Sequence, residues 1–330
     1  MSDENVMEVE ATATEAAPEI TAKFTRDELV RGWPEREPRS PKCVPIVKFG
    51  AKTDLGRVRE NNEDKFDFYE VSDPTLLAHR GSFYAVADGM GGHAGGQFAS
   101  ELALKNVIFN YYSSETDDVA KAVLEAFTFA NDQIYGLAQA NPERNGMGTT
   151  LSALFVKEDR VYVGQIGDSR AYLIRDGEIR QVTFDHSWVA EQVRAGILTE
   201  EEAETSPYRN IITRSMGTGA LIEPDVFVEE AHPGDIWVIC SDGLTGHVNA
   251  DEIRLVALTQ LPCETARQLI ELASARGGRD NITVFCIHIV DVWQNPDAAN
   301  GSGAHVATPE AVEAAPADER NVLKRIFGKS

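Results

Sequence analysis

The chain has 330 residues, a length that fits one large domain or two medium ones. Hydrophobic residues make up 42% and charged residues 25%, as in ordinary soluble globular proteins, whereas a formal net charge of -22 excludes nucleic acid as a partner because its phosphates would be repelled. A phosphate-handling site in so acidic a chain needs local cations, since most of its side-chain charges have the wrong sign.

Residues 1–45 are predicted to form a disordered acidic tail and a linker. Residues 1–22 hold six acidic and no basic side chains, a composition that buries too little apolar surface to order itself. Four prolines follow between residues 34 and 45. The start also lacks the basic, apolar pattern of a secretory signal.

Residues 46–293 are predicted to form the globular domain. Its apolar runs are typical of strands at 82–87, 150–156, 161–166, 171–174, 235–240 and 282–289. Helices are expected at 97–112, 117–140, 250–258 and 263–275, with Asp117 as a helix start and Asn141 before Pro142 as a stop. Because strands come in clusters and helices in pairs, the pattern favours sheets packed face to face with helices outside over a regular βαβ alternation.

Residues 294–330 are predicted to be a flexible tail. Its basic and apolar end, NVLKRIFGKS, fits a docking motif, a small amphipathic helix or a frayed terminus. The four cysteines include no CxxC pair, which argues against a zinc ribbon and fits a reducing compartment. No apolar run approaches the ~20 residues of a membrane span, so a cytoplasmic protein without a membrane span is expected.

Aspartates follow three of the predicted strands. The runs FYAVADG, VGQIGDS and WVICSDG carry Asp88, Asp168 and Asp242 at their ends, and GGRDNITV places Asp280 just before a fourth strand. Each aspartate alone also suits a plain turn role. Gathered together, the four would form an oxygen-rich, negative cluster of the kind that Mg²⁺ and Mn²⁺ prefer.

An upstream segment, TDLGRVRENNEDKF, sets Arg57 and Arg59 shortly before Glu63 and Asp64. An arginine offers a planar fork that matches the oxygens of a phosphate group. A solvated charged turn is the competing interpretation of this segment taken alone.

The ordered series RVRENNED, ADGMGGHAGG, GTTLSALFV, GQIGDSRAYLIRDGEI, DHS, CSDGL and GGRDNITV resembles the PPM-type (type 2C) metal-dependent serine/threonine protein phosphatases in their compact bacterial form. The resemblance covers about residues 49–289. It implies an α+β fold, a four-layer α/β/β/α sandwich of two antiparallel sheets flanked by helix pairs. Residues 46–293 would then be the phosphatase catalytic domain.

The resemblance also implies a centre of two Mn²⁺ or Mg²⁺ ions, with a third bound more weakly. By matching motif, the following residues would serve the metals: Asp88 as the bridge, Gly89 through its carbonyl, Asp242 and Asp280 as ligands, Asp64 through water, and Asp168 at the third ion. Arg59 would bind the phosphate, and residues 193–214 would form a flap beside the site. A metal-activated water would attack phosphorus with no covalent intermediate.

The general acid is open at this stage. Some members of the family carry His directly after the Asp-Gly pair, a position that is Met90 here, and His93 follows three residues later. His93 is the proposed acid, with a merely hydrogen-bonding loop histidine as the equal alternative. His186, in the DHS block, is expected to have a structural role.

Two other functions compete with this interpretation. A dinucleotide-binding oxidoreductase would use residues 89–94, which satisfy GxGxxA after a strand, but two predicted helices follow instead of a compact βαβ unit. A catalytically inactive phosphoprotein-binding module of the same fold is the other, and the presence of all the expected acids argues against it. Expected partners are phosphorylated proteins, including a serine/threonine kinase, and the chain is expected to be a monomer.

Overall fold

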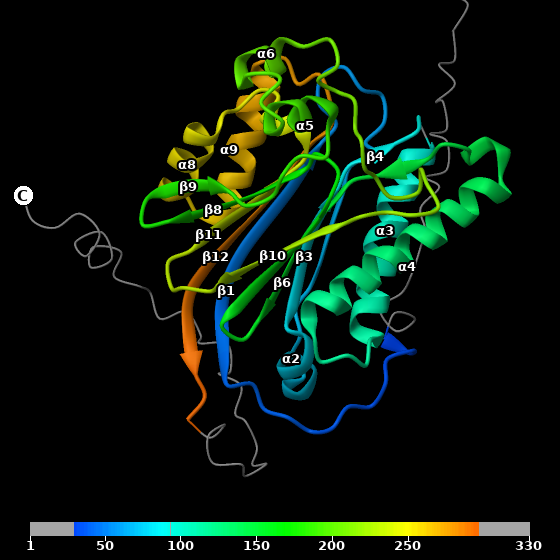
Figure 1. The fold of residues 1–330 in the computed structure, drawn as a ribbon. Coiled ribbons are helices and arrows are strands. Elements are labelled where there is room, and N and C mark those ends of the chain that lie inside the picture. The colour runs from blue at the N-terminus through cyan, green and yellow to red at the C-terminus, as the bar shows by residue number, and fades with distance from the viewer. Residues whose placement is uncertain (1–29, 93, 297–330) are drawn as a thin grey trace, which may run out of the picture.

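The computed structural model describes residues 30–92 and 94–296, which fold around two five-stranded sheets that face each other (Figure 1). The first sheet has the order β1 (Cys43–Asp54), β12 (Ile282–Gln294), β11 (Ile236–Cys240), β8 (Arg170–Arg175), β9 (Glu178–Gln181). The second has the order β10 (Asp225–Glu230), β7 (Arg160–Ile166), β6 (Leu151–Lys157), β3 (Ser82–Ala87), β2 (Lys65–Tyr69). Every strand pair within these sheets is antiparallel.

Helices cover the outer face of each sheet. The long pair α3 (Ala94–Ser113) and α4 (Val119–Ala140) lies on the second sheet, and the pair α8 (Ala250–Thr259) and α9 (Pro262–Ala275) lies on the first (Figure 1). The predicted four-layer α/β/β/α sandwich is therefore confirmed. The remaining elements are α2 (Pro74–Arg80), β4 (Gly89–Met90), η1 (Pro142–Arg144), β5 (Gly148–Thr149), α5 (Trp188–Arg194), α6 (Glu200–Thr205) and α7 (Asp242–Thr245).

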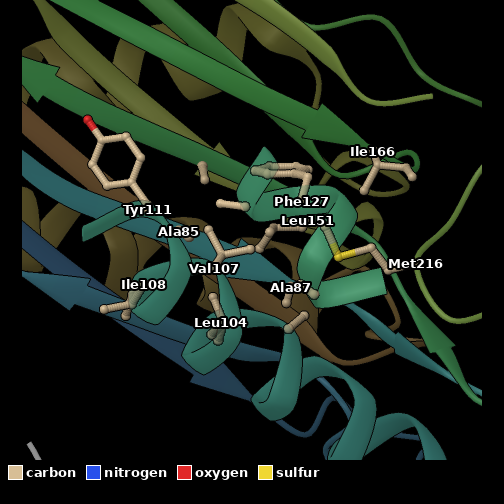
Figure 2. Packing of buried hydrophobic residues seen from close by; sticks show 14 of the residues in the cluster. Ala85, Ala87, Leu104, Val107, Ile108, Tyr111, Phe127, Leu151, Ile166 and Met216 are labelled. Atoms are coloured by element: carbon tan, nitrogen blue, oxygen red, sulfur yellow. The ribbon is translucent and has the colours of Figure 1, made fainter. Parts of the chain in front are cut away.

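The central strands are apolar throughout because both of their faces are buried. In β3, Phe83, Ala85 and Ala87 pack under α3 and α4, whereas Tyr84 and Val86 point to the opposite sheet. Figure 2 shows the first of these cores, with Ala85 and Ala87 beside Leu104 and Val107 of α3. Alternation along a strand thus supplies two cores at once, and the strand appears in the sequence as one unbroken apolar run.

The predicted central elements agree with the structure to within about two residues at most ends, but the edge strands were missed. β2, β9 and β10 are polar on one face, and β1 is interrupted by Pro45, Lys48 and Gly50. The cap of α4 is Asp118, whose side chain accepts a hydrogen bond from the backbone N–H of Lys121, rather than Asp117. The predicted end of the last strand, at residue 289, is five residues too early, since β12 runs to Gln294.

Part of the predicted linker contacts the domain. The Trp33 ring stacks on Tyr112 with 4.8 Å between ring centroids and meets Tyr69 edge-on. Arg36 donates from Nη2 to the carbonyl oxygens of Tyr112 and Ser114 at 2.9 and 2.6 Å. These contacts show that the folded region begins before residue 46, the predicted start of the domain. β1 itself begins at Cys43.

The predicted acidic tail at 1–22 and the basic, apolar piece at 321–330 lie outside the described residues. Within the described residues, each helix is too short or too polar to span a bilayer.

Candidate metal centre

The sheet topology brings the predicted aspartates to one end of the sandwich. β3 and β7 both pair antiparallel with β6, so they run in the same direction and deliver Asp88 and Asp168 to the same edge. In the facing sheet β11 ends just before Asp242, and β12, its antiparallel neighbour, begins just after Asp280. Four residues far apart in the chain therefore lie at the same end of the sandwich.

Asp64 joins this edge from the loop before β2. It is almost fully buried, and Ser241 Oγ donates a hydrogen bond to its Oδ2 at 2.7 Å. The same serine oxygen accepts from the backbone N–H of Thr283, which fixes the hydroxyl between β11 and β12. Asp64 is thus held against the strand that carries Asp242.

In the absence of a cation, the surroundings of the aspartates disfavour their charged form. Burial raises the pKa of Asp64 to about 7 and that of Asp168 to about 8, and repulsion from Asp242 adds to both shifts. Burial and then repulsion from its acidic neighbours raise the pKa of Asp88 well above its usual range. The pKa of Asp242 is raised by burial and by Asp280. Four buried or half-buried carboxyl groups therefore call for a compensating positive charge.

The unpaired oxygens of the cluster fit a divalent cation. Buried Oδ1 atoms of Asp64, Asp168 and Asp242 have no hydrogen-bond donor among the described residues. The carboxyl groups of Asp88 and Asp242 lie within hydrogen-bond reach of each other. Hard oxygen donors of this kind are the ligands that Mg²⁺ and Mn²⁺ take.

Side chains alone do not complete the coordination of a metal ion at this site. Within residues 30–92 and 94–296, no three acidic, histidine or cysteine side chains are drawn together tightly enough to surround an ion by themselves. Asp280 points instead to Arg59, with 2.6 Å between Oδ2 and Nη2. Carbonyl oxygens, water and a rotation of Asp280 would have to complete the coordination, as suits Mg²⁺-type ions that keep several waters.

Gly89 fits its expected role because the chain is crowded there. A Cβ at this position would lie 2.2 Å from the carbonyl oxygen of Gly96 and 2.7 Å from that of Glu63. Any side chain would therefore push α3 and the Glu63 loop away from the carboxylates. The glycine keeps the backbone next to Asp88 close to the cluster.

Asn281 ties the arginine-bearing loop to the strand that follows Asp280. Its Nδ2 donates to the carbonyl oxygens of Leu55 and Asn61, both at 3.0 Å, and its Oδ1 accepts from the backbone N–H of Glu63 at 2.8 Å. This clamp brings Arg59, which is more than half exposed, beside Asp280. The pKa of Arg59 is raised by its hydrogen bond with Asp280.

The two predicted histidines have different outcomes. His93 lies outside the described residues. His186 is buried, with Nδ1 accepting from the backbone N–H of Gly167 at 3.2 Å and Nε2 lying 3.0 Å from Asp225 Oδ2. It positions the turn before Asp168, which is a structural role.

A cavity of about 860 Å³ opens beside Asp168 and Asp242. One wall is made by α5 and by α6, which lies in the segment 193–214 expected to form the flap, and the other by α7 and the start of α8. Its volume lies in the range of ligand sites.

Sequence reasoning missed three residues that shape the site: Ser241, Asn281 as a clamp, and His247. Ser241 and Asn281 adjoin Asp242 and Asp280 in the sequence, so adjacency was the available signal. His247, five residues after Asp242, lines the cavity. Nothing in its local sequence indicates that position.

Comparison with known proteins identifies the family that this chain matches. The family model described as protein phosphatase 2C matches residues 51–194. A putative protein phosphatase 2C-type of Streptococcus pyogenes is 38% identical over 246 residues, which is 73% of this chain and 97% of that protein.

Two solved structures are similar as well. The catalytic domain of the serine/threonine protein phosphatase PstP, in complex with two manganese ions, aligns with a TM-score of 0.64 and 36% identity, covering 74% of this chain and 99% of that one. The serine/threonine phosphatase Stp1 from Staphylococcus aureus aligns with a TM-score of 0.69 and 33% identity, covering 77% and 99%.

Proposed function

The chain belongs to the protein phosphatase 2C family, and from this membership we propose that it hydrolyses phosphoserine and phosphothreonine in other proteins with two Mn²⁺ or Mg²⁺ ions. The observation that carries the proposal is the buried aspartate cluster with oxygens that lack donors. A catalytically inactive binding module has no need for such a cluster. The oxidoreductase alternative is wrong, because β3 leads into an antiparallel sheet with no βαβ unit.

Six residues would hold the metals. Asp88 would bridge them, the Gly89 carbonyl, Asp242 and Asp280 would complete the pair, Asp64 would act through water, and Asp168 would serve a third ion. When bound, two divalent cations lower the pKa of a water between them and neutralise the oxygens of the phosphoryl group.

The protein's own contribution is to hold the carboxylates in place and to orient the substrate. Ser241 holds the Asp64 carboxylate in one rotamer through the 2.7 Å hydrogen bond. Arg59, exposed beside Asp280, would turn its guanidinium to two phosphoryl oxygens and share the charge that develops on them. The attacking oxygen and the leaving side-chain oxygen would then lie in line through phosphorus.

The finer assignments belong to the same proposal. We place a serine/threonine kinase among the phosphorylated partners and expect a monomer. The four cysteines are all free, three of them buried, which supports a reducing, cytoplasmic location.

Hydrolysis of p-nitrophenyl phosphate and of a phosphoserine peptide tests the function. We expect turnover with Mn²⁺ that stops on addition of a chelator and returns with excess metal. Binding of the phosphopeptide without turnover, at every Mn²⁺ and Mg²⁺ concentration, would instead establish the inactive module.

A further inference from the structure

The aspartate cluster and Arg59 leave one requirement of the proposed reaction unmet. A serine or threonine alkoxide is a poor leaving group, so the oxygen that leaves phosphorus needs a hydrogen-bond donor as its charge develops. The carboxylates are acceptors, and Arg59 is assigned to the phosphoryl oxygens. The donor has to come from another side chain.

His93, the acid expected from the sequence, and His305 lie outside the described residues, and the other five of the seven histidines in the chain are described. Four of these lie elsewhere: His79 is in the last turn of α2, His186 is buried against Asp225, His232 precedes β11 near Glu230, and His288 is within β12. His247 alone among the five lines the cavity that also holds Asp168 and Asp242.

His247 is held in place from two sides. Arg276 donates from Nη1 to its carbonyl oxygen at 2.7 Å, and Arg276 is itself fixed by Glu252 at 2.7 Å. The backbone N–H of Arg279, next to Asp280, donates to the imidazole Nε2 across a long 3.4 Å. The ring is therefore tied to the loop that carries a proposed metal ligand.

These contacts fix the form of the imidazole. A backbone N–H can only donate, so Nε2 accepts and a neutral ring carries its proton on Nδ1. Within the described part of the chain, Nδ1 makes no hydrogen bond, and the residue is half-buried at the cavity wall. The Nδ1–H is a donor that this wall can offer to a ligand beside Asp242.

We propose that the Nδ1–H of neutral His247 donates a hydrogen bond to the serine or threonine oxygen that leaves phosphorus. The inference rests on the proposed phosphatase function. In the step, the bond from phosphorus to the side-chain oxygen breaks and its electron pair stays on that oxygen, while a water oxygen forms the new bond to phosphorus. The proton lost by that water passes to solvent, and the alkoxide takes one from solvent, so one water is consumed.

Three replacements at this position separate donation from anchoring. Asn places its amide nitrogen where Nδ1 lies, Gln places its terminal group nearer to Nε2, and Leu offers neither. With phenyl phosphate as substrate, donation predicts that His247→Asn keeps much of the activity while His247→Gln and His247→Leu lose it. Rescue by His247→Gln instead of His247→Asn would mean that the residue only anchors the Arg279 loop, and would overturn the proposal.

The leaving group decides which step is affected. Nitrophenolate needs little stabilisation, whereas phenolate needs more, and both substrates lack a peptide that could be recognised elsewhere. In His247→Leu, turnover of p-nitrophenyl phosphate should stay within about 3-fold of that of the unmodified protein. Turnover of phenyl phosphate should fall about 10-fold or more. Equal loss on both substrates, or no loss on either, would overturn the proposal. Absence of Mn²⁺-dependent turnover in the unmodified protein would instead refute the phosphatase function.

A binding measurement gives a readout that does not depend on turnover. A thiophosphoserine peptide, which keeps the bridging oxygen and is hydrolysed slowly because sulfur replaces a non-bridging oxygen, is added to the Mg²⁺-loaded protein, and histidine resonances are followed by ¹⁵N NMR. The His247 signal, identified by its loss in His247→Leu, should shift on binding, while the signal of surface His232 stays in place. An unmoved His247 signal at saturating peptide would contradict contact with the leaving group.

Discussion

Arg59 and Asp280 form an ion pair with 2.6 Å between Nη2 and Oδ2, although each is proposed to serve a different ligand in the working enzyme. The pair is about half exposed, so it contributes little to stability by itself. If Asp280 holds metal and Arg59 holds phosphate as proposed, this pair would have to open before either residue serves its ligand.

The first prediction concerns Arg59→Ala. Loss of the guanidinium should raise KM for p-nitrophenyl phosphate about 10-fold, since one charge-assisted contact with phosphate disappears. It should not weaken Mn²⁺ binding, because Arg59 would no longer compete with the metal for the Asp280 carboxylate. Enzyme kinetics and calorimetric Mn²⁺ titration check the two parts. Arg57→Ala is the matched control, as Arg57 is exposed on the same loop and has no carboxylate partner among the described residues; a weaker Mn²⁺ affinity in Arg59→Ala would contradict the competition.

The second prediction concerns Asp88→Asn. Burial and then repulsion from neighbouring acids raise the pKa of Asp88, so the folded metal-free protein disfavours this carboxylate, and the variant should melt at the same temperature as the unmodified protein or higher. Turnover should fall at least about 100-fold, because a proposed bridging ligand is lost. The Tm gain that Mn²⁺ gives the unmodified protein should vanish. Thermal unfolding with and without Mn²⁺ measures both effects.

Asp176→Asn is the control for that variant. Asp176 lies in the exposed turn between β8 and β9 with φ of 53°, a conformation that Asn also accepts. It should leave activity and the Mn²⁺-dependent Tm gain unchanged. Near-normal turnover of Asp88→Asn would remove Asp88 from the metal centre.

The third prediction tests the N-terminal edge of the domain through Trp33→Ala. The ring packs against Tyr69 and Tyr112, so its loss should lower the free energy of unfolding by about 1–3 kcal/mol, less than for a fully buried tryptophan. Urea denaturation followed by circular dichroism measures the change. Activity per folded molecule should not alter, since α2 and the end of α3 lie far from Asp88. If stability does not fall, residues 33–42 do not contribute to the fold and form a linker, as the sequence predicted.

The fourth prediction concerns His288, on β12. Burial and, to a smaller extent, the charge of Lys48 lower the pKa of its imidazole to about 4. In the unfolded chain the ring protonates near pH 6.5, so the unfolded state binds more protons between the two values. The contribution of His288 to stability should therefore be complete above about pH 6.5 and be lost as the pH falls toward 4.

His288→Gln removes this titration. Urea unfolding at a series of pH values should show a shallower loss of stability between pH 6.5 and 4 in the variant than in the unmodified protein. Parallel curves for the two proteins would show that His288 does not couple folding to pH.

The sequence by itself determined the central elements and the residue types of the site. Strands such as β3 and β11 are buried on both faces, so they form unbroken apolar runs that no solvent-facing pattern obscures. The aspartates at their ends are also local signals. Edge strands such as β9 carry polar residues on one face, and their pairing comes from backbone hydrogen bonds to a neighbour, which local composition does not encode.

Only the tertiary structure decided how the site is assembled. The hydrogen bond from Ser241 to Asp64 joins residues 177 positions apart, and the Asn281 clamp joins a loop and a strand more than 200 positions apart. His247 reaches the cavity because α7 ends beside it. Contacts between distant segments depend on how two sheets stack and which edges coincide, because side-chain chemistry fixes what a residue can bind while packing fixes which residues meet.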